Sequence, residues 1–266
     1  MTYKDYVFPS RPQAVEVLRY AIEQNPKDAN AHMHLGNLLG HLGRLEEAVQ
    51  HWQIAAELNN DLSIAFRKLG LYWWVADELD KAESSYRKAI TARREDQTLY
   101  RDLAEILIEN HKRPQAIELI TTMPIAGMRR ADIIIIWGQA YLDEGRYDEC
   151  IDLIETTPYF VNWEGSSITW DIFNQAHMKR GMQQLEKKDF AAALQDFRAA
   201  LTYPENIGVG RPNHPEEAEE YYFIAKSLED LGKMEEARQA WKKGAAGREG
   251  SEKQNKYRDL CRKALQ

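Results

Sequence analysis

The sequence has few cysteines and no long apolar run. Cys150 and Cys261 are the two cysteines in 266 residues, and neither belongs to a CxxC pair, which argues against a disulfide framework and against a zinc site. A membrane span needs about 18 consecutive apolar residues, and no stretch approaches that length. The opening residues MTYKDYVFPSRPQ lack the apolar core of a secretory signal. These features predict a cytoplasmic protein with no membrane partner.

Positive charge is the scarcer sign. Lys and Arg number 35 against 42 Asp and Glu, which gives a formal net charge of −7 at pH 7. A phosphate backbone attracts proteins that carry an excess of positive charge. Nucleic acid is therefore not expected as a partner.

The chain contains an internal repeat with a step of 34 residues, shown by the small residues Gly36, Gly70, Ala104 and Gly138. Such a period is typical of solenoids. A second small residue and a large apolar residue four positions later keep the same step, in the series Ala14, Ala48, Ala82, Ala116, Cys150 and Leu18, Trp52, Tyr86, Ile120, Ile154. The pattern of small and large residues in each repeat indicates two helices joined by a short turn. Because antiparallel helices pack closely only where a small residue lies at their crossing, we expect Gly36 to face Ala48.

This pattern resembles the tetratricopeptide repeat, and the unit 63–96 fits it best, with Phe66, Leu69, Gly70, Trp73, Ala82, Tyr86 and Ala89 in the expected places. The resemblance implies an all-α fold, a right-handed α-solenoid of antiparallel helix pairs. After Gly138 the step lengthens to 43 and 44 residues, at Gly181 and Ala225, which predicts two inserted loops. We expect an extended segment 1–10 and a single solenoid over 11–266. Its parts are a lone helix 11–26, repeats 29–62, 63–96, 97–130, 131–164, 174–207 and 218–250, loops at about 158–173 and 204–216, and a capping helix 251–266.

Candidate catalytic and metal-binding residues are sparse. His32, His34, His41 and His51 are close in sequence but lack the i, i+4 spacing of helical metal ligands, so packing is favoured over metal binding. Cys150 stands where other units have alanine, which favours a small buried residue over a nucleophile. The GVG stretch is too short for a phosphate-binding loop. We expect no enzyme activity, no cofactor and no metal.

In tetratricopeptide families, one face of the first helix of each unit lines a concave groove for partner segments. Here that face is unusually apolar, and it predicts a partner-binding groove formed by Met33, Asn37, Arg67, Leu71, Trp74, Arg101, Glu105, Ile108, Gln139 and Leu142. Trp74 is the expected anchor. Arg67 and Arg101 share a position in adjacent units and offer two cations to a carboxylate or to backbone carbonyls of the bound segment. The alternative is that curvature of the solenoid buries part of this face.

The two insertions should leave the same edge of the solenoid, which makes a second candidate site. Its residues are Trp163 and Glu164 in the first loop and Asn206, Arg211 and His214 in the second. The alternative is that both are long connectors that pack aromatic residues over the core.

Three motifs, DYVFPSRPQAVEVL, NWEG and LTYPENIGVG, also resemble the C-terminal tail of large bacterial proteins in which a mutarotase-like β-sandwich region of unknown function precedes tetratricopeptide repeats. Together with the unpaired opening helix, this resemblance implies that the native polypeptide extends N-terminal of Tyr3. We expect a non-enzymatic scaffold that binds an apolar segment of another protein or of its parent's β-sandwich region. The alternative is an accessory module that completes the active site of a larger carbohydrate-active protein. The sequence does not specify an oligomeric state.

Overall fold

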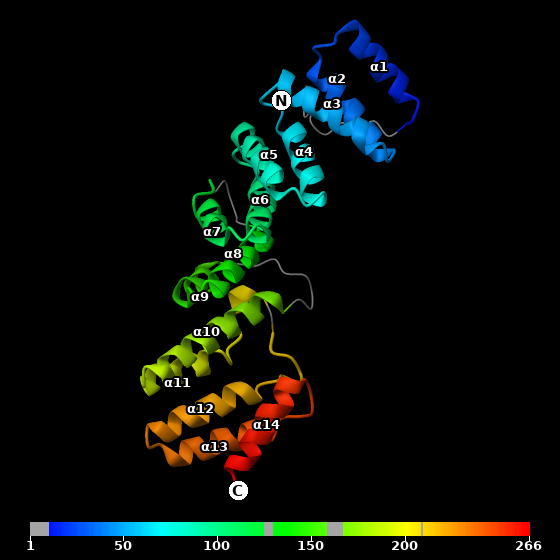
Figure 1. Cartoon of the computed structure of the whole chain (residues 1–266). Coiled ribbons are helices and arrows are strands. Elements are labelled where there is room, and N and C mark those ends of the chain that lie inside the picture. The colour runs from blue at the N-terminus through cyan, green and yellow to red at the C-terminus, as the bar shows by residue number, and fades with distance from the viewer. Residues whose placement is uncertain (1–10, 125–129, 159–166, 209) are drawn as a thin grey trace. The chain divides into compact units, whose positions relative to one another are not determined.

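The computed structural model describes residues 11–124, 130–158, 167–208 and 210–266. Within these ranges the chain forms fourteen α-helices, the short 3₁₀ helix η2 and no strand (Figure 1), which confirms the predicted all-α class. None of the helices in these ranges is long and apolar enough to cross a membrane. The contacts divide the chain into two compact units, residues 1–128 and 129–266. Continuity of the solenoid from one unit to the next stays a prediction, and the expected extended segment 1–10 lies outside the described residues.

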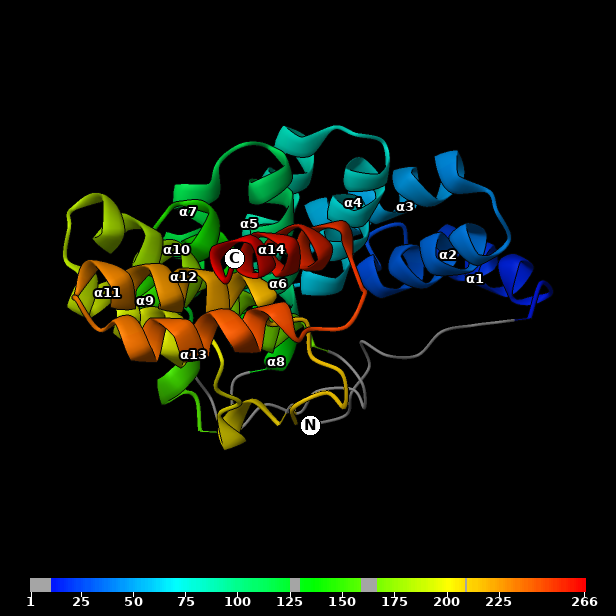
Figure 2. The same ribbon diagram turned by 90° about the horizontal axis from the view of Figure 1, so that it is seen from below.

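The first unit is a lone helix followed by three helix pairs. Helix α1 (Ala14–Gln24) precedes the pairs α2 (Ala29–His41) with α3 (Leu45–Leu58), α4 (Ser63–Val75) with α5 (Leu79–Ala92), and α6 (Gln97–Glu109) with α7 (Arg113–Thr121). The helices of a pair run antiparallel, and each helix packs on the next one along the chain (Figures 1 and 2). Helices α2 and α6 begin where Asp28 and Asp96 accept hydrogen bonds from backbone N–H groups of the first turn.

A tight turn with one left-handed residue joins the helices of every pair. That residue is the fifteenth of each repeat, namely Gly43, Asp77, His111, Gly145, Lys188 and Gly232, with φ between +57° and +77°. The chain then folds back so that the N–H of Arg44 donates to the carbonyl of Leu39, which ends α2. Glycine recurs in these turns because it adopts this conformation without a steric penalty.

The small residue of the first helix makes room for the large residue of the second. A Cβ atom on Gly36 would lie 2.6 Å from the Trp52 ring and 3.0 Å from the carbonyl oxygen of Ala48. A Cβ atom on Gly70 would lie 2.5 Å from the Tyr86 ring. Gly36 therefore faces Ala48 as expected, and the Trp52 ring, four residues further along, lies closer still.

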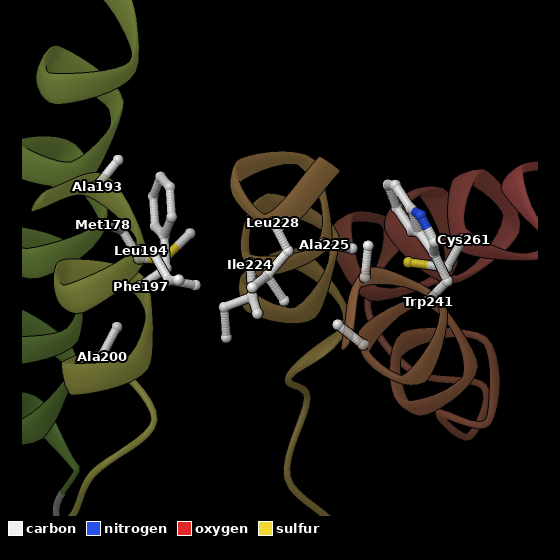
Figure 3. Packing of buried hydrophobic residues seen from close by; sticks show 12 residues of the cluster. Met178, Ala193, Leu194, Phe197, Ala200, Ile224, Ala225, Leu228, Trp241 and Cys261 are labelled. Carbon is white, nitrogen blue, oxygen red and sulfur yellow. The ribbon is translucent and has the colours of Figure 1, made fainter. Parts of the chain in front are cut away.

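The second unit contains three further pairs and a terminal helix. These are α8 (Ala131–Asp143) with α9 (Tyr147–Thr156), α10 (Ile168–Glu186) with α11 (Phe190–Ala199), α12 (Ala218–Asp230) with α13 (Met234–Ala245), and α14 (Glu252–Ala264). Helix α14 packs on both α12 and α13. Its Cys261 is fully buried and belongs to the same apolar cluster as Phe197 and Trp241 (Figure 3). This cluster joins α10 to α14 into one core.

The first inserted loop is shorter than predicted. Helix α10 begins at Ile168 rather than at 174, and Thr169, Ile172 and Phe173 in its first turns are buried. The loop expected over about 158–173 therefore ends earlier than predicted. Burying these side chains in a packed helix stabilises the fold more than leaving them in an open connector would. The second expected loop, 204–216, contains η2 (Glu205–Ile207), whose Ile207 is fully buried.

Candidate functional site

Helix α4 leaves more apolar surface uncovered than the other first helices of its length. It has nine apolar residues among 13, as does α8, but four of its residues are buried where α8 buries seven. Helices α2 and α6, also of 13 residues, bury seven each. A helix that is apolar on several faces is normally covered on several faces, so α4 has a face without a partner in its own unit.

The uncovered face is a stripe of Leu71, Trp74 and Val75, one helical turn apart. Val75 is 82% exposed and Leu71 is 44% exposed, and Trp74 is half-buried. The indole N–H of Trp74 donates to Oε2 of Glu109, at the end of α6, over 2.6 Å. The predicted anchor is thus held in place by the neighbouring pair and keeps part of its surface accessible.

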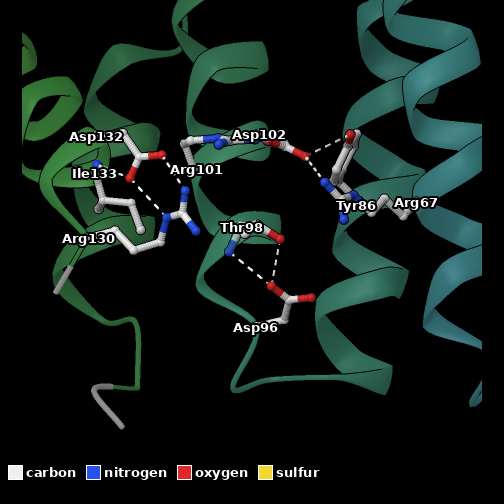
Figure 4. Close-up of polar contacts among 9 residues, drawn as sticks. All are labelled: Arg67, Tyr86, Asp96, Thr98, Arg101, Asp102, Arg130, Asp132 and Ile133. Carbon is white, nitrogen blue, oxygen red and sulfur yellow. Dashed lines mark hydrogen bonds and ion pairs between the residues drawn. The ribbon is translucent and has the colours of Figure 1, made fainter. Parts of the chain in front are cut away.

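The two predicted cations share one buried carboxylate, that of Asp102 on α6 (Figure 4). Its Oδ2 lies 3.4 Å from Nη2 of Arg67 and accepts from the Tyr86 hydroxyl over 3.1 Å. Its Oδ1 accepts from Nε of Arg101 over 2.9 Å. The ligand-binding role of Arg67 and Arg101 stays a prediction, and both already pair with an internal carboxylate that ties α4, α5 and α6 together. The contact surface beside them is mainly apolar.

Two predicted groove residues belong to the core. Met33 on α2 is 3% exposed and Leu142 on α8 is 1% exposed, so both are corrected to packing residues. Helix α2 lies between α1 and α3, and α8 packs on both α9 and α10. At these two positions the predicted wall is buried.

The other predicted groove residues differ in their surroundings. Asn37 accepts a hydrogen bond from the Trp52 indole over 3.1 Å. Glu105 and Ile108 on α6 are half-buried. Gln139 on α8 is exposed and donates to Asp143 over 2.7 Å. Within the first unit, the accessible part of the predicted wall is therefore centred on α4.

The loop residue Asn206 anchors the second insertion to the scaffold. Its Nδ2 donates to the carbonyls of Ile154 and Thr157, over 2.7 and 2.8 Å, where α9 ends. Both amide hydrogens are thus used within the chain. Trp163 and Glu164, the candidates in the first loop, lie outside the described residues.

Arg211 and His214 also have partners on the scaffold. Nε of Arg211 donates to Glu217 over 2.9 Å, and Nε2 of His214 lies 3.0 Å from Nη1 of Arg248. Asn206, Arg211 and His214 therefore each contact a different residue of their own unit. This arrangement favours the connector interpretation for the second loop.

Replacing Asn206 with alanine is expected to destabilise the second unit by about 1–2 kcal/mol, because two carbonyls at the end of α9 lose their donor. Urea unfolding of the full chain, with hydrogen exchange at the last turn of α9, measures this. His214→Ala is the control in the same loop and should change stability by less than about 0.5 kcal/mol. Equal losses in the two variants would contradict the anchoring role of Asn206.

The buried cysteine and histidine side chains fit packing roles. Burial raises the pKa of the Cys150 thiol to about 12, and the thiol donates to the carbonyl of Gly138 over 3.3 Å. Nδ1 of His32 lies 2.9 Å from Nδ1 of His51, and its Nε2 lies 3.3 Å from the carbonyl of Pro26. Across the described ranges, no three His, Cys, Asp or Glu side chains are grouped so as to hold a metal ion.

Comparison with known families identifies the repeat. Residues 10–63 and 178–252 match the family model described as tetratricopeptide repeat. Over these two ranges the chain is similar to tetratricopeptide repeats. Similar solved structures include YrrB, a tetratricopeptide repeat protein with an unusual peptide-binding site, at 21% identity over 71% of this chain and 92% of that one, with a TM-score of 0.51. The search of curated proteins found no significant match.

Two further similar structures align with nearly the whole chain. The Naa15/Naa10 structure bound to HypK-THB is 17% identical over 94% of this chain and 36% of that one, with a TM-score of 0.62. A tetratricopeptide repeat protein from Parabacteroides merdae is 15% identical over 94% and 91%, with a TM-score of 0.49. At 17% identity, the similarity to the Naa15/Naa10 structure shows the fold alone.

Val75 is the residue of the site that the repeat pattern did not identify. It is the thirteenth residue of its tetratricopeptide repeat, one beyond the last position assigned to the groove face. The spacing of apolar residues could have identified it, because Val75 follows Leu71 by four residues and so lies on the same helical face.

Proposed function

We propose that this chain is a non-enzymatic scaffold for protein–protein or interdomain contacts, and that the exposed face of α4 binds an apolar segment of the partner. The observation that carries the proposal is the accessible stripe of Leu71, Trp74 and Val75 on a helix that buries four of its 13 residues. Contiguous exposed apolar surface of this kind marks interaction sites.

The chemistry of the stripe suits an apolar ligand. Trp74 offers a large anchoring surface, and its one polar group is already satisfied by Glu109, so a ligand needs no matching acceptor. Arg67 already pairs with the buried carboxylate of Asp102. Binding should therefore depend only modestly on salt.

We further propose that the partner is another protein or the β-sandwich region predicted to precede this chain in its parent. YrrB, which shares the fold, is described as having an unusual peptide-binding site, and a peptide segment is the ligand class that this comparison suggests. A cytoplasmic location stays a prediction from the sequence.

The competing function is an accessory module that completes a carbohydrate-active site through the inserted loops. It has less support, because the loop residues already donate hydrogen bonds within their own unit. Asn206 donates to Ile154 and Thr157, and Arg211 donates to Glu217. It predicts that sugars raise the thermal stability of the chain. A scaffold predicts no such shift.

Trp74→Ala is expected to weaken the binding of apolar peptides at least about 30-fold, which corresponds to about 2 kcal/mol at 1.4 kcal/mol per decade. Peptides are selected from a random dodecapeptide display library on the full chain, and their affinities are measured by fluorescence polarisation. Val75→Glu, at an exposed position, should also abolish binding while leaving the helical signal unchanged.

Met234→Glu is the matched control, since Met234 is 62% exposed but lies on α13 of the other unit. It should leave the affinity unchanged. If peptides bind the Trp74 and Val75 variants as well as the wild type, the binding surface is not the α4 stripe. Collapse of the helical signal in Trp74→Ala would instead place Trp74 in the core.

A further inference from the structure

Three hollows lie at equivalent places between successive second helices. One, of about 470 Å³, lies between α3 and α5 over α4. Another, of about 440 Å³, lies between α5 and α7. A third, of about 320 Å³, lies in the second unit between α11 and α13 over α12. The repeat thus offers the same kind of groove several times, with different linings.

The hollow between α3 and α5, here the α3–α5 groove, has an apolar floor and a polar rim. Its floor is formed by Phe66 and Leu69 of α4, each 7% exposed. The amides of Gln53 and Asn60 lie on the α3 side, and Lys88 lies on the α5 side. A volume of about 470 Å³ falls within the range of ligand pockets.

The groove between α11 and α13, here the closed groove, is the equivalent site in the second unit, with a smaller hollow of about 320 Å³ and an ion pair across it. There Arg198 and Glu236 form an ion pair of 3.4 Å between the two second helices. By position in the repeat, Arg198 corresponds to Gln53 and Glu236 to Lys81. Neither pairs across the α3–α5 groove, because Gln53 is uncharged and Lys81 pairs with Glu78 over 3.2 Å.

The two grooves also differ in the size of one lining side chain. Leu201 in the closed groove corresponds to Ala56 in the α3–α5 groove, so three carbon atoms fewer occupy the open one. The hollow between α5 and α7 differs again, since its lining includes the ion pair of Arg87 with Glu83 at 2.8 Å. Of these three grooves, the α3–α5 groove combines an apolar floor with an open rim.

Lys88 gives the open groove a positive charge next to its floor. Its Nζ lies 5.8 Å from the centroid of the Phe66 ring, as Nζ of Lys243 lies 5.5 Å from Tyr221 in the closed groove. Among the described residues, Lys88 has no carboxylate in ion-pair range. Glu57 is the one acidic residue of the lining, and it lies on the opposite rim, on the α3 side.

We propose that the α3–α5 groove is a second binding site, for an extended peptide in which an aromatic or large aliphatic residue stands next to an acidic one. The apolar side chain lies on Phe66 and Leu69, and the neighbouring carboxylate pairs with Lys88. The amides of Gln53 and Asn60 bond the peptide backbone. This site is separate from the stripe of Leu71, Trp74 and Val75.

The test uses the full chain with Val75→Glu, so that the stripe is disabled and failure of one site does not imply failure of the other. A random nonapeptide display library is selected on this protein, and affinities of enriched peptides are measured by fluorescence polarisation. The expected peptides pair Phe, Tyr, Leu or Ile with Asp or Glu. Lys88→Glu should weaken them at least about 10-fold, and Glu57→Gln should not.

The decisive variant is Gln53→Arg with Lys81→Glu, which reproduces the ion pair of the closed groove on two surface residues. It should also lower the affinity at least about 10-fold, and Ala56→Leu should act in the same direction. Unchanged helical content by circular dichroism confirms folding. The proposal is overturned if no peptide is enriched, if the double variant binds as before, or if Lys88→Glu has no effect.

Discussion

Gly70→Ala is expected to lower the free energy of unfolding of the α4–α5 pair by about 1–3 kcal/mol. The added Cβ would lie 2.5 Å from Cδ2 of Tyr86. Tyr86 is fully buried, and its hydroxyl donates to Asp102 over 3.1 Å, so the ring cannot turn aside without losing that bond. The better helix propensity of alanine, about 1 kcal/mol over glycine, offsets only part of this cost.

Gly138→Ala is the matched control at the same place in its repeat. The nearest atoms to an added Cβ are Cγ2 of Ile172 at 3.4 Å and Cδ1 of Ile154 at 3.8 Å. The preceding repeat already combines Ala104 with Ile120 at these two places. The substitution should therefore be neutral or stabilise by up to about 1 kcal/mol.

Hydrogen exchange of the helical amides measures both effects, because it gives local free energies in a repeat protein that does not unfold in one step. Increased or unchanged protection of α4 and α5 in Gly70→Ala would contradict the steric account. Ala225 does coexist with Trp241, whose indole donates to Glu229. An alanine thus coexists there with a hydrogen-bonded ring, whereas a Cβ on Gly70 would lie 2.5 Å from the Tyr86 ring.

Asp196→Ala is expected to destabilise the second unit by about 3 kcal/mol, since it removes one partner of a buried ion pair. Asp196 on α11 is 4% exposed. It accepts from Nδ1 of His177 over 2.9 Å and from Nη2 of Arg180 over 2.6 Å, both on α10. Without it, the buried imidazole loses its Nδ1 partner, the partly buried guanidinium is left with the exposed Asp148, and the α10–α11 pair loses this polar link.

Asp148→Ala provides the comparison on the same guanidinium. Asp148 accepts from Nη1 of Arg180 over 2.7 Å, but its side chain is 82% exposed. An exposed pair of this kind contributes about 0–1 kcal/mol. Urea unfolding should therefore separate the two variants clearly, and similar losses in both would mean that burial does not govern the strength of this cluster.

The same cluster predicts a loss of stability in acid. Burial alone would raise the pKa of Asp196, but the hydrogen bonds from His177 and Arg180 outweigh it and leave the pKa below its usual value. A carboxylate with a lowered folded pKa contributes stability above its unfolded pKa of about 3.9 and loses it as pH falls through the folded value. Stability of the wild type should fall as the pH drops below about 5 and through the lowered folded pKa of Asp196, and the fall should be shallower in Asp196→Ala.

The polar contacts of the site were beyond what the sequence pattern could indicate. Arg67 and Arg101 share a repeat position, which suggested two cations available to a ligand. Asp102, however, has the pattern of an ordinary helical residue, and nothing in its neighbours along the chain shows that it is buried beside Tyr86. The same holds for Asn206, whose partners Ile154 and Thr157 precede it by about fifty residues.

The sequence by itself determined the helix-pair repeat and its resemblance to the tetratricopeptide repeat, because the spacing of small and large residues is set by local helix geometry and by one helix crossing inside each repeat. Only the tertiary structure decided which part of the predicted wall is open. Met33 and Leu142 are buried while Leu71 and Val75 are exposed, although the repeat pattern treats Met33, Leu71 and Leu142 alike. The exposure of each side chain depends on how closely the neighbouring helices approach it. That distance is set by many side-chain contacts between successive repeats rather than by any single repeat.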